Sequence, residues 1–350
     1  QGGRMKNVQP SFKALIATIA SGKTLTVDEA KAAFNIILSG DATPAQMGAF
    51  LMGLHLRGET VDELIGGVSV LREKATYITA PENAVDVVGT GGDGHGTLNI
   101  STAAAFITAG AGVPVAKHGN KAASSRSGTA DVQAVLGINT ECDFALTERA
   151  IHEAGIGFMV AYRHHGAMRH VGPTRGELGI RTIFNLLGVM SNPAAVKRQL
   201  IGVYDMRWMH PMAETLRKLG STHIWIMEGS DGLDELTTTG PSRVVEMKDG
   251  DITEFEITPE QFGIQKVSLE ELKGGTPEEN AKALMALLNG TPGPYRDVAL
   301  LNAGAAIMIG GKCDTVAEGI ELARQSIDTG AALSAFEALK RISNETVKAV

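Results

Sequence analysis

A glycine-rich segment after a valine-rich run most strongly constrains what this chain can fold into. The segment reads VGTGGDGHGTLNIST, and five glycines fall within the eight residues Gly89–Gly96. The run Val85–Val88 before it is typical of a strand, and the small residues after it predict a helix over Ala103–Ala109. A loop so rich in glycine costs conformational entropy. It is tolerated where backbone N–H groups must approach a ligand, and the adjoining helix N-terminus favours an anion.

A second loop one structural unit later carries cations and hydroxyls. It lies between a predicted strand over Val113–Lys117 and a helix that begins near Thr129. Its polar side chains are those of Lys117, His118, Asn120, Lys121, Ser124, Ser125, Arg126 and Ser127. Together the two loops indicate a ligand with several phosphates. Their spacing fits neither a Walker loop, which ends in Gly-Lys-Ser/Thr, nor a Rossmann fingerprint.

Composition favours a metabolic enzyme. The chain has 350 residues, of which 43% are hydrophobic, so it is long enough for two domains or one large one. The formal net charge of −7 argues against a general nucleic-acid binder. Its two cysteines form no motif, which predicts a reducing, cytoplasmic location. The apolar run 100–116 is interrupted by Gly and Pro, so no membrane span is expected.

Periodicity divides the chain into a helical first part and an alternating second part. Helices are predicted over Phe12–Ala20, Thr26–Ser39, Pro44–Arg57 and Val61–Lys74. From Val85 strands and helices alternate; the later strands are expected over Ile156–Val160, Ile201–Tyr204, His223–Met227 and a hairpin of Val244–Met247 with Asp251–Ile257. Later helices are expected from Thr147-Glu148 to Gly155 and over Pro211–Leu219, Pro277–Leu288, Asp297–Ile309 and Thr315–Ser326. This pattern predicts an α/β domain with a mostly parallel sheet flanked by helices.

The motifs together resemble the anthranilate phosphoribosyltransferase family of tryptophan biosynthesis. The resemblance begins with GTGGDG…NIST and KHGN…SSRSGTAD and covers the chain from about Phe12. It continues through ELGIRTIFNLLG (177–188), NPA (192–194), QLIGVYD (199–205), DGLDELTTTGP (231–241), LKGG (272–275) and LLNAGAA (300–306). It implies a small all-helical domain over 5–78, rejoined by about 174–198, and an α/β domain over 79–173 and 199–350.

This resemblance implies an activity and a set of site residues. The family transfers phosphoribosyl from phosphoribosyl pyrophosphate (PRPP) to the amino nitrogen of anthranilate and releases pyrophosphate. The implied PRPP-binding residues are Gly89, Thr90, Gly91, Gly92, Asp93, Thr97, Asn99, Ser101, Thr102, Lys117, Ser125 and Ser127. The implied acceptor-binding residues are Gly89, His118, Asn120, His165 and Arg175, and the implied Mg²⁺ ligands are Ser101, Asp234 and Glu235. No single catalytic acid or base is implied, and a homodimer through the helical domain is expected.

Other interpretations of these residues stay open at this stage. Adjacent carboxylates such as Asp234-Glu235 also occur in solvated turns, Asp231 is assigned to turn chemistry, and Arg175 is also expected as a surface ion pair with Glu177. Whether one or two Mg²⁺ ions bind is not determined. Two relatives of similar architecture are alternatives: a pyrimidine-nucleoside phosphorylase and a non-catalytic nucleic-acid-binding protein.

The chain departs from the family pattern near the implied acceptor site. After Val160, most members read Ala-Pro, two variable residues and His-Pro-Ala-Met, whereas this chain reads AYRHHGAM. Tyr162 and Gly166 replace the prolines, and Gly176 and Val189 are further departures. Losing prolines and gaining glycines is expected to loosen the loop. The departures predict either continued use of anthranilate or a remodelled site for a different aromatic acceptor.

Overall fold

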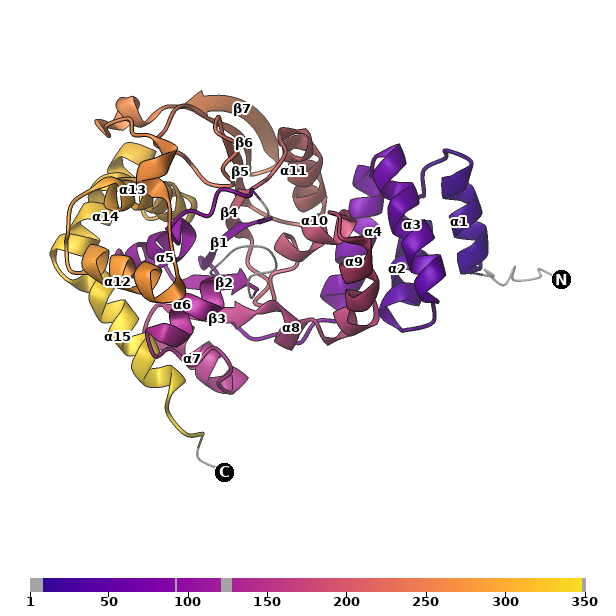
Figure 1. Cartoon of the computed structure of the whole chain (residues 1–350), viewed down its shortest axis with the longest axis horizontal. Coiled ribbons are helices and arrows are strands. Elements are labelled where there is room, and N and C mark those ends of the chain that lie inside the picture. Colours follow the sequence, from indigo (N-terminus) through magenta and orange to yellow (C-terminus); the bar gives the residue numbers. More distant parts are fainter. Residues whose placement is uncertain (1–8, 92, 121–127, 348–350) are drawn as a thin grey trace. The chain divides into compact units, whose positions relative to one another are not determined.

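Residues 9–91, 93–120 and 128–347, which the computed structural model describes, divide into two units (Figure 1). One unit contains the described residues up to Ala75 together with His165–Ser191. The other contains Thr76–His164 and the described residues from Asn192 onward. The domain limits inferred from the resemblance, 5–78 with about 174–198 against 79–173 with 199–350, remain a prediction.

The first unit is entirely helical. Its helices are α1 (Phe12–Ala20), α2 (Val27–Leu38), α3 (Pro44–Arg57), α4 (Val61–Glu73), α9 (Gly172–Leu178) and α10 (Ile183–Val189), with the 3₁₀ turn η1 (Gly166–His170). Thr26, Thr43 and Thr60 each begin a helix with a capping box, which satisfies otherwise orphaned N–H groups. In the core Phe34 packs edge-to-face against Phe50 and Phe184, with ring centroids 5.5 and 5.6 Å apart.

The second unit is built on a seven-stranded sheet of order β3-β2-β1-β4-β5-β6-β7. Its strands are β1 (Val85–Gly89), β2 (Val115–Gly119), β3 (Ile156–Val160), β4 (Arg198–Gly202), β5 (His223–Gly229), β6 (Ser242–Lys248) and β7 (Asp251–Ile257). The first five are parallel, and β6 and β7 form the predicted antiparallel hairpin at one edge. The fold class predicted from the sequence is confirmed.

Helices cover this sheet on both faces. The unit contains α5 (Ile100–Gly110), α6 (Thr129–Val135), α7 (Phe144–Glu153), α8 (Ala161–His164), α11 (Met209–Lys218), α12 (Pro277–Leu288), α13 (Pro294–Ile309), α14 (Val316–Asp328) and α15 (Ala331–Ser343). Helices α5, α13 and α14 pack together on one side of the sheet, and α11 lies along β5 and β6 on the other (Figure 1). Among the described residues, three 3₁₀ turns complete the unit's connections or precede its helices: η2 (Met206–Trp208), η3 (Pro259–Phe262) and η4 (Leu269–Leu272).

Several element limits differ from the sequence prediction. Helix α15 was not predicted, although buried Ala332, Phe336 and Leu339 recur at helical spacing. Helix α7 begins at Phe144 rather than Thr147, because the Asp143 side chain caps it. Strand β2 lies two residues later than predicted, at Val115–Gly119, strand β4 earlier, at Arg198–Gly202, and α13 begins at Pro294 rather than Asp297. Within the described ranges, no helix is both long and apolar enough to cross a bilayer.

Candidate active site

The candidate site lies at the carboxyl edge of the parallel strands. The chain leaves β1 for β2 and β3 on one side and returns to β4 and β5 on the other, so the strand order reverses next to β1. Open α/β sheets bind ligands in the crevice at such a switch point. Strands β1 and β4 end in register at Gly89 and Gly202, and the glycine-rich loop leaves from Gly89.

The first part of the glycine-rich loop is tied to the neighbouring strand ends. The Thr90 N–H donates to the carbonyl oxygen of Gly202 (2.9 Å), and the Thr90 hydroxyl accepts from the Tyr204 N–H (3.1 Å). Gly91 has a φ of +70°, which favours glycine, and its N–H donates to Oδ2 of Asp234 (2.9 Å). Asp93 accepts from the His95 N–H, and Gly92 lies outside the described residues.

The second part of the loop pairs with the LKGG segment. The Leu98 N–H donates to Leu272 O (2.9 Å), the Gly274 N–H donates to Gly96 O (2.9 Å), and Thr97 forms a bridge with Lys273. These bonds satisfy backbone groups that a free loop would leave to solvent. They hold the chain as it enters α5.

The N-terminus of α5 offers unsatisfied polar groups. Asn99 is the N-cap residue, but its side chain does not cap the helix. The buried atoms Asn99 Oδ1 and Thr102 Oγ1 have no hydrogen-bond partner among the described residues. The Thr102 side chain has no exposed surface. The Tyr295 hydroxyl donates to Asn99 O (2.8 Å) and fixes this end of the helix. The Thr102 hydroxyl can donate to a ligand, Asn99 Oδ1 can accept from one, and the helix N-terminus favours an anion.

The loop after β5 brings two carboxylates to the same edge. Burial, together with the neighbouring Asp93 carboxylate, raises the pKa of Asp234 to about 7. Burial and Asp234 raise the pKa of Glu235 well above its usual value, while the charge of Lys117 and the nearby backbone N–H of Ser101 lower it. These carboxylates are therefore close together and poorly solvated, a state that a divalent cation would stabilise.

Hydrogen bonds on two sides hold the loop that carries Asp234 and Glu235. Asp231 accepts from the Leu233 N–H (3.1 Å) and from the hydroxyls of Thr237 (2.8 Å) and Thr239 (2.7 Å), which is turn chemistry. On the other side, buried Asn302 accepts from the Leu236 N–H and donates to Leu236 O, at 3.0 and 2.9 Å. The loop is thus fixed by a turn and by a buried amide from α13.

Two glycines let this loop cross the strand ends. A Cβ on Gly202 would lie 1.6 Å from the carbonyl oxygen of Asp234, and a Cβ on Gly89 would lie 2.4 Å from Asp234 Oδ2. Only glycine permits such an approach. Gly202, Tyr295 and Asn302 were not among the predicted site residues, and the sequence prediction placed Gly202 inside a strand over Ile201–Tyr204 rather than at the end of β4.

Lys117 reaches the same edge from β2. It is buried, and its Nζ donates to Val87 O (2.6 Å). Burial lowers its pKa, whereas the carboxylates of Asp86, Glu235 and Asp234 raise it. The lysine is therefore not the solvated surface charge that its position at a strand end would ordinarily suggest.

The other predicted site residues are divided between the two units, and some lie outside the described residues. His118 is buried at the end of β2 and donates its N–H to Asp86 Oδ1 (3.1 Å), while Asn120 is exposed at the start of the second loop. Ser125 and Ser127 lie outside the described residues. His165 and Arg175 belong to the helical unit. There His165 is buried, and the Arg175 guanidinium lies 5.6 Å from the centroid of the Phe184 ring. Within the described part of the chain Arg175 forms no ion pair with Glu177.

The departures at Tyr162 and Arg163 face a neighbouring segment of the same unit. Arg163 donates to Cys142 O (2.7 Å) and to Thr140 O (3.4 Å), and its guanidinium lies 4.7 Å from the centroid of the Phe144 ring. His164 stacks on the same ring with centroids 4.2 Å apart. These contacts hold the segment whose prolines are missing.

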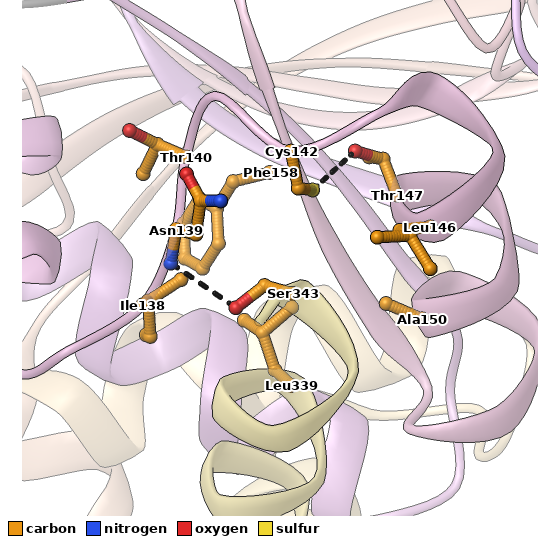
Figure 2. Close-up of a pocket in the computed structure, with 10 residues that line it drawn as sticks. All are labelled: Ile138, Asn139, Thr140, Cys142, Leu146, Thr147, Ala150, Phe158, Leu339 and Ser343. Atoms are coloured by element: carbon orange, nitrogen blue, oxygen red, sulfur yellow. Dashed lines mark hydrogen bonds between the residues drawn. The ribbon is translucent and has the colours of Figure 1, made fainter. Parts of the chain in front are cut away.

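Residues 138–142 are also held from the opposite side. Ile138, Asn139, Thr140 and Cys142 line a small pocket with residues of α7 and the end of α15, where the Asn139 N–H donates to Ser343 Oγ (3.1 Å) (Figure 2). Cys142 Sγ lies 3.4 Å from Thr147 Oγ1. The Tyr162 hydroxyl donates to Glu141 within this segment. Tyr162 and Arg163 thus make structural contacts to a fixed segment.

Known proteins match nearly the whole chain. Residues 81–333 match a glycosyl transferase family a/b domain, and residues 13–75 match the helical bundle domain of a glycosyl transferase family. An anthranilate phosphoribosyltransferase of Rhodopseudomonas palustris (strain BisA53) is 57% identical over 333 residues, which are 95% of this chain and 98% of that protein. The chain belongs to the anthranilate phosphoribosyltransferase family.

Solved structures agree with this family assignment. The anthranilate phosphoribosyltransferase of Thermus thermophilus is 40% identical and superposes with a TM-score of 0.90, covering 95% of this chain and 99% of that one. The enzyme from Saccharomyces cerevisiae in complex with PRPP and Mg is 27% identical, with a TM-score of 0.86 and coverage of 95% and 97%. The resemblance inferred from the motifs is confirmed.

Proposed function

We propose that the protein is a Mg²⁺-dependent anthranilate phosphoribosyltransferase that transfers phosphoribosyl from PRPP to the amino nitrogen of anthranilate and releases pyrophosphate, the second step of tryptophan biosynthesis from chorismate. The observation that carries the proposal is the convergence of three groups at the switch point of the sheet. They are the glycine-rich loop, the α5 N-terminus with its unsatisfied Asn99 Oδ1, and the close carboxylates of Asp234 and Glu235. Membership of the family supports the same activity.

The donor site is assigned to the loop and to α5. The pyrophosphate of PRPP lies at the N-terminus of α5, where the Thr102 hydroxyl donates to it and the helix dipole favours an anion, while the unsatisfied Asn99 Oδ1 accepts from a ligand hydroxyl. Backbone amides of the glycine-rich loop face the ribose. Lys117 contributes a positive charge to the phosphorylated sugar. The other PRPP contacts proposed from the resemblance are Thr90, Gly91, Gly92, Asp93, Thr97, Ser101, Ser125 and Ser127.

The residues present fit a magnesium ion. Asp234 and Glu235 supply the hard carboxylate oxygens that Mg²⁺ prefers, and the repulsion that raises their pKa values would fall beside a divalent cation. Ser101, whose backbone N–H lies near Glu235, adds a hydroxyl. When bound, the ion neutralises negative charge that develops on the departing pyrophosphate.

The reaction needs positioning more than a strong base. The bond between the anomeric carbon and a pyrophosphate oxygen breaks, positive charge develops on the ribose ring, and the amino nitrogen forms the new bond with its lone pair. The nitrogen then loses a proton to solvent. The chain's contribution is to hold both substrates in line and to place its donors where charge develops.

The acceptor contacts proposed from the resemblance are Gly89, His118, Asn120, His165 and Arg175. An arginine binds a carboxylate such as that of anthranilate with two parallel hydrogen bonds. Burial lowers the pKa of Arg175, and its position over Phe184 leaves the guanidinium without a protein carboxylate among the described residues. Because Tyr162 and Arg163 contact the 140–144 segment, their presence supports continued use of anthranilate rather than a different aromatic acceptor.

The test is pyrophosphate release from PRPP and Mg²⁺ with and without anthranilate. We expect saturable release that requires anthranilate and falls at least about tenfold with meta- or para-aminobenzoate, because a displaced amino group loses its alignment. Release only with another aromatic amine would establish the remodelled site instead. Phosphate-dependent cleavage of a pyrimidine nucleoside without PRPP would establish the phosphorylase. Salt-sensitive DNA binding without turnover would establish the non-catalytic alternative.

We further propose a cytoplasmic homodimer formed through the helical unit. Leu56 on α3 is 78% exposed, an unusual position for a large aliphatic side chain, and it supports an apolar interface there. We expect sedimentation at dimer mass for the wild type and a shift to monomer for Leu56→Glu. Lys23→Glu, a charge change on a loop of the same unit, serves as the control. A dimer unaffected by Leu56→Glu would place the interface elsewhere.

A further inference from the structure

The N-cap residue of α5 does not cap its own helix. At an ordinary N-cap the backbone is extended and the side chain accepts from an N–H of the first turn. Thr26, Thr43 and Thr276 do this, with ψ values of 166°, 158° and 162°. Asn99 is a residue type favoured at this position, yet its ψ is 76° and its side chain forms no cap hydrogen bond. Its Oδ1 is buried and has no partner among the described residues.

Hydrogen bonds on both sides of Asn99 hold it in this conformation. Before it, the Leu98 N–H donates to Leu272 O (2.9 Å). After it, the Asn99 carbonyl oxygen accepts twice, from the Ala103 N–H within α5 (3.1 Å) and from the Tyr295 hydroxyl (2.8 Å). Because ψ sets the angle between the side chain of a residue and its own carbonyl group, holding the backbone on both sides also fixes the Asn99 side chain.

Tyr295 is well placed to hold this carbonyl group. It follows Pro294 in the first turn of α13, and its side chain is buried. Burial and the charge of Glu235 raise the pKa of Tyr295 above its usual value, so the hydroxyl stays protonated and donates. Two turns further along the same helix, Asn302 holds the Leu236 backbone. Helix α13 therefore binds both the N-terminus of α5 and the loop that carries the two carboxylates.

We propose that Tyr295 is a positioning residue of the transfer reaction: its hydroxyl holds the Asn99 carbonyl group and thereby keeps the Asn99 side chain off the first turn of α5 and available to PRPP. This inference rests on the proposed function, in which Asn99 Oδ1 accepts from a ligand hydroxyl. Tyr295 is assigned no contact with substrate, and its effect passes through Asn99. Without the hydroxyl, we expect Asn99 to adopt ordinary N-cap geometry, in which Oδ1 accepts from a helix N–H instead of from the ligand.

The first test is Tyr295→Phe, which removes only the hydroxyl. The Asn99 carbonyl oxygen keeps its bond from Ala103, so the melting temperature without ligand should fall by no more than about 4 °C. We expect the PRPP KM to rise about tenfold or more, because a binding group is misplaced, while the anthranilate KM at saturating PRPP stays within about twofold. An unchanged PRPP KM would overturn the proposal.

A double-mutant cycle with Asn99→Ala separates positioning of this side chain from other effects of Tyr295→Phe. Alanine has no polar side chain to misplace, so adding Tyr295→Phe to Asn99→Ala should change the PRPP KM less than about twofold. If Tyr295→Phe raises the PRPP KM equally with and without the Asn99 side chain, Tyr295 does not act through Asn99 and the proposal is wrong.

Melting temperatures from the same cycle, measured without ligand, test the proposal independently of the reaction. In the wild type Asn99 Oδ1 has no partner among the described residues, so Asn99→Ala should not lower the melting temperature. In the Tyr295→Phe background the same change should lower it by about 2–4 °C, because it removes a newly formed cap. Equal shifts in the two backgrounds would contradict the proposal. A wild type that transfers nothing from PRPP would end the proposed function, while these temperatures still report whether Tyr295 holds Asn99 off the helix.

Ser326→Ala is the matched control. The Ser326 hydroxyl of α14 donates to Ile107 O (2.7 Å), so it also joins a neighbouring helix to a backbone carbonyl of α5, but near the other end. We expect a similar fall in melting temperature and a PRPP KM within about twofold of wild type. If Ser326→Ala raised the PRPP KM as much as Tyr295→Phe, any loosening of α5 would weaken PRPP binding, and the specific role of Tyr295 would be refuted.

Discussion

Asp234→Asn is expected to lower kcat/KM for PRPP by about 100-fold or more while raising the melting temperature of the ligand-free protein at pH 8. The activity falls because a ligand to a catalytic metal contributes several kcal/mol of charge stabilisation. The stability rises because the carboxylate is half-buried beside Asp93, which makes its ionised form unfavourable. An asparagine oxygen can still accept from the Gly91 N–H, so the loop keeps its hydrogen bond.

The pH dependence of stability separates this effect from general loosening of the loop. In the unfolded chain Asp234 releases its proton near the ordinary value of 3.8, whereas the folded protein retains it up to about pH 7. Its contribution to stability is therefore complete below about pH 4 and is lost as the pH rises through 7. Calorimetry from pH 5 to pH 8 should show a falling melting temperature for the ligand-free wild type and a smaller fall for Asp234→Asn.

Asp231 provides the control on the same loop. Its carboxylate accepts from Leu233 and from two threonine hydroxyls, so Asp231→Asn should lower the melting temperature at every pH in this range. Adding Mg²⁺ with PRPP should raise the melting temperature of the wild type more than that of Asp234→Asn, because a ligand stabilises the state that binds it. Identical pH slopes for the wild type and Asp234→Asn would contradict the assignment of this carboxylate.

Local signals in the sequence predicted those parts of the fold that depend on near neighbours. The helix that Thr26 begins with a capping box and the hairpin of β6 with β7 each depend on residues a few positions apart, and both elements were predicted correctly. The glycine-rich loop between a strand and a helix belongs to the same class. Helix α15 was not predicted, although its apolar residues recur at helical spacing in the sequence.

Contacts between distant segments could not be predicted in this way. Asn302 holds the Leu236 backbone across 66 residues, and the Tyr295 hydroxyl binds Asn99 O across 196 residues. Neither side chain has a local pattern that marks its partner. Asp86 carried no signal at all, because an acidic residue in a valine-rich run looks like an interruption of a strand until its buried donors are known.

Gly202→Ala is expected to reduce kcat/KM for PRPP by about 100-fold, since displacement of catalytic groups by about 1 Å has effects of this size. Its added Cβ would lie 1.6 Å from Asp234 O and 2.3 Å from the Asp234 carbonyl carbon, so the loop carrying both carboxylates must move. Overpacking of this kind also costs about 1–3 kcal/mol of stability. Steady-state kinetics with varied Mg²⁺ and thermal unfolding are the measurements.

Gly119 and Gly89 also end parallel strands, and their alanine variants serve as comparisons for Gly202→Ala. Gly119 ends β2, and a Cβ there would meet no heavy atom of the described residues within 4 Å, so Gly119→Ala should leave kcat/KM within about twofold. Gly89→Ala should be intermediate, because the nearest atom to its Cβ, at 2.4 Å, belongs to the Asp234 side chain, which can rotate, rather than to backbone. The loss of kcat/KM is therefore expected to increase from Gly119→Ala through Gly89→Ala to Gly202→Ala. Full activity in Gly202→Ala would mean that the Asp234 loop does not cross β4 closely in the working enzyme, and would remove the steric reason for a glycine there.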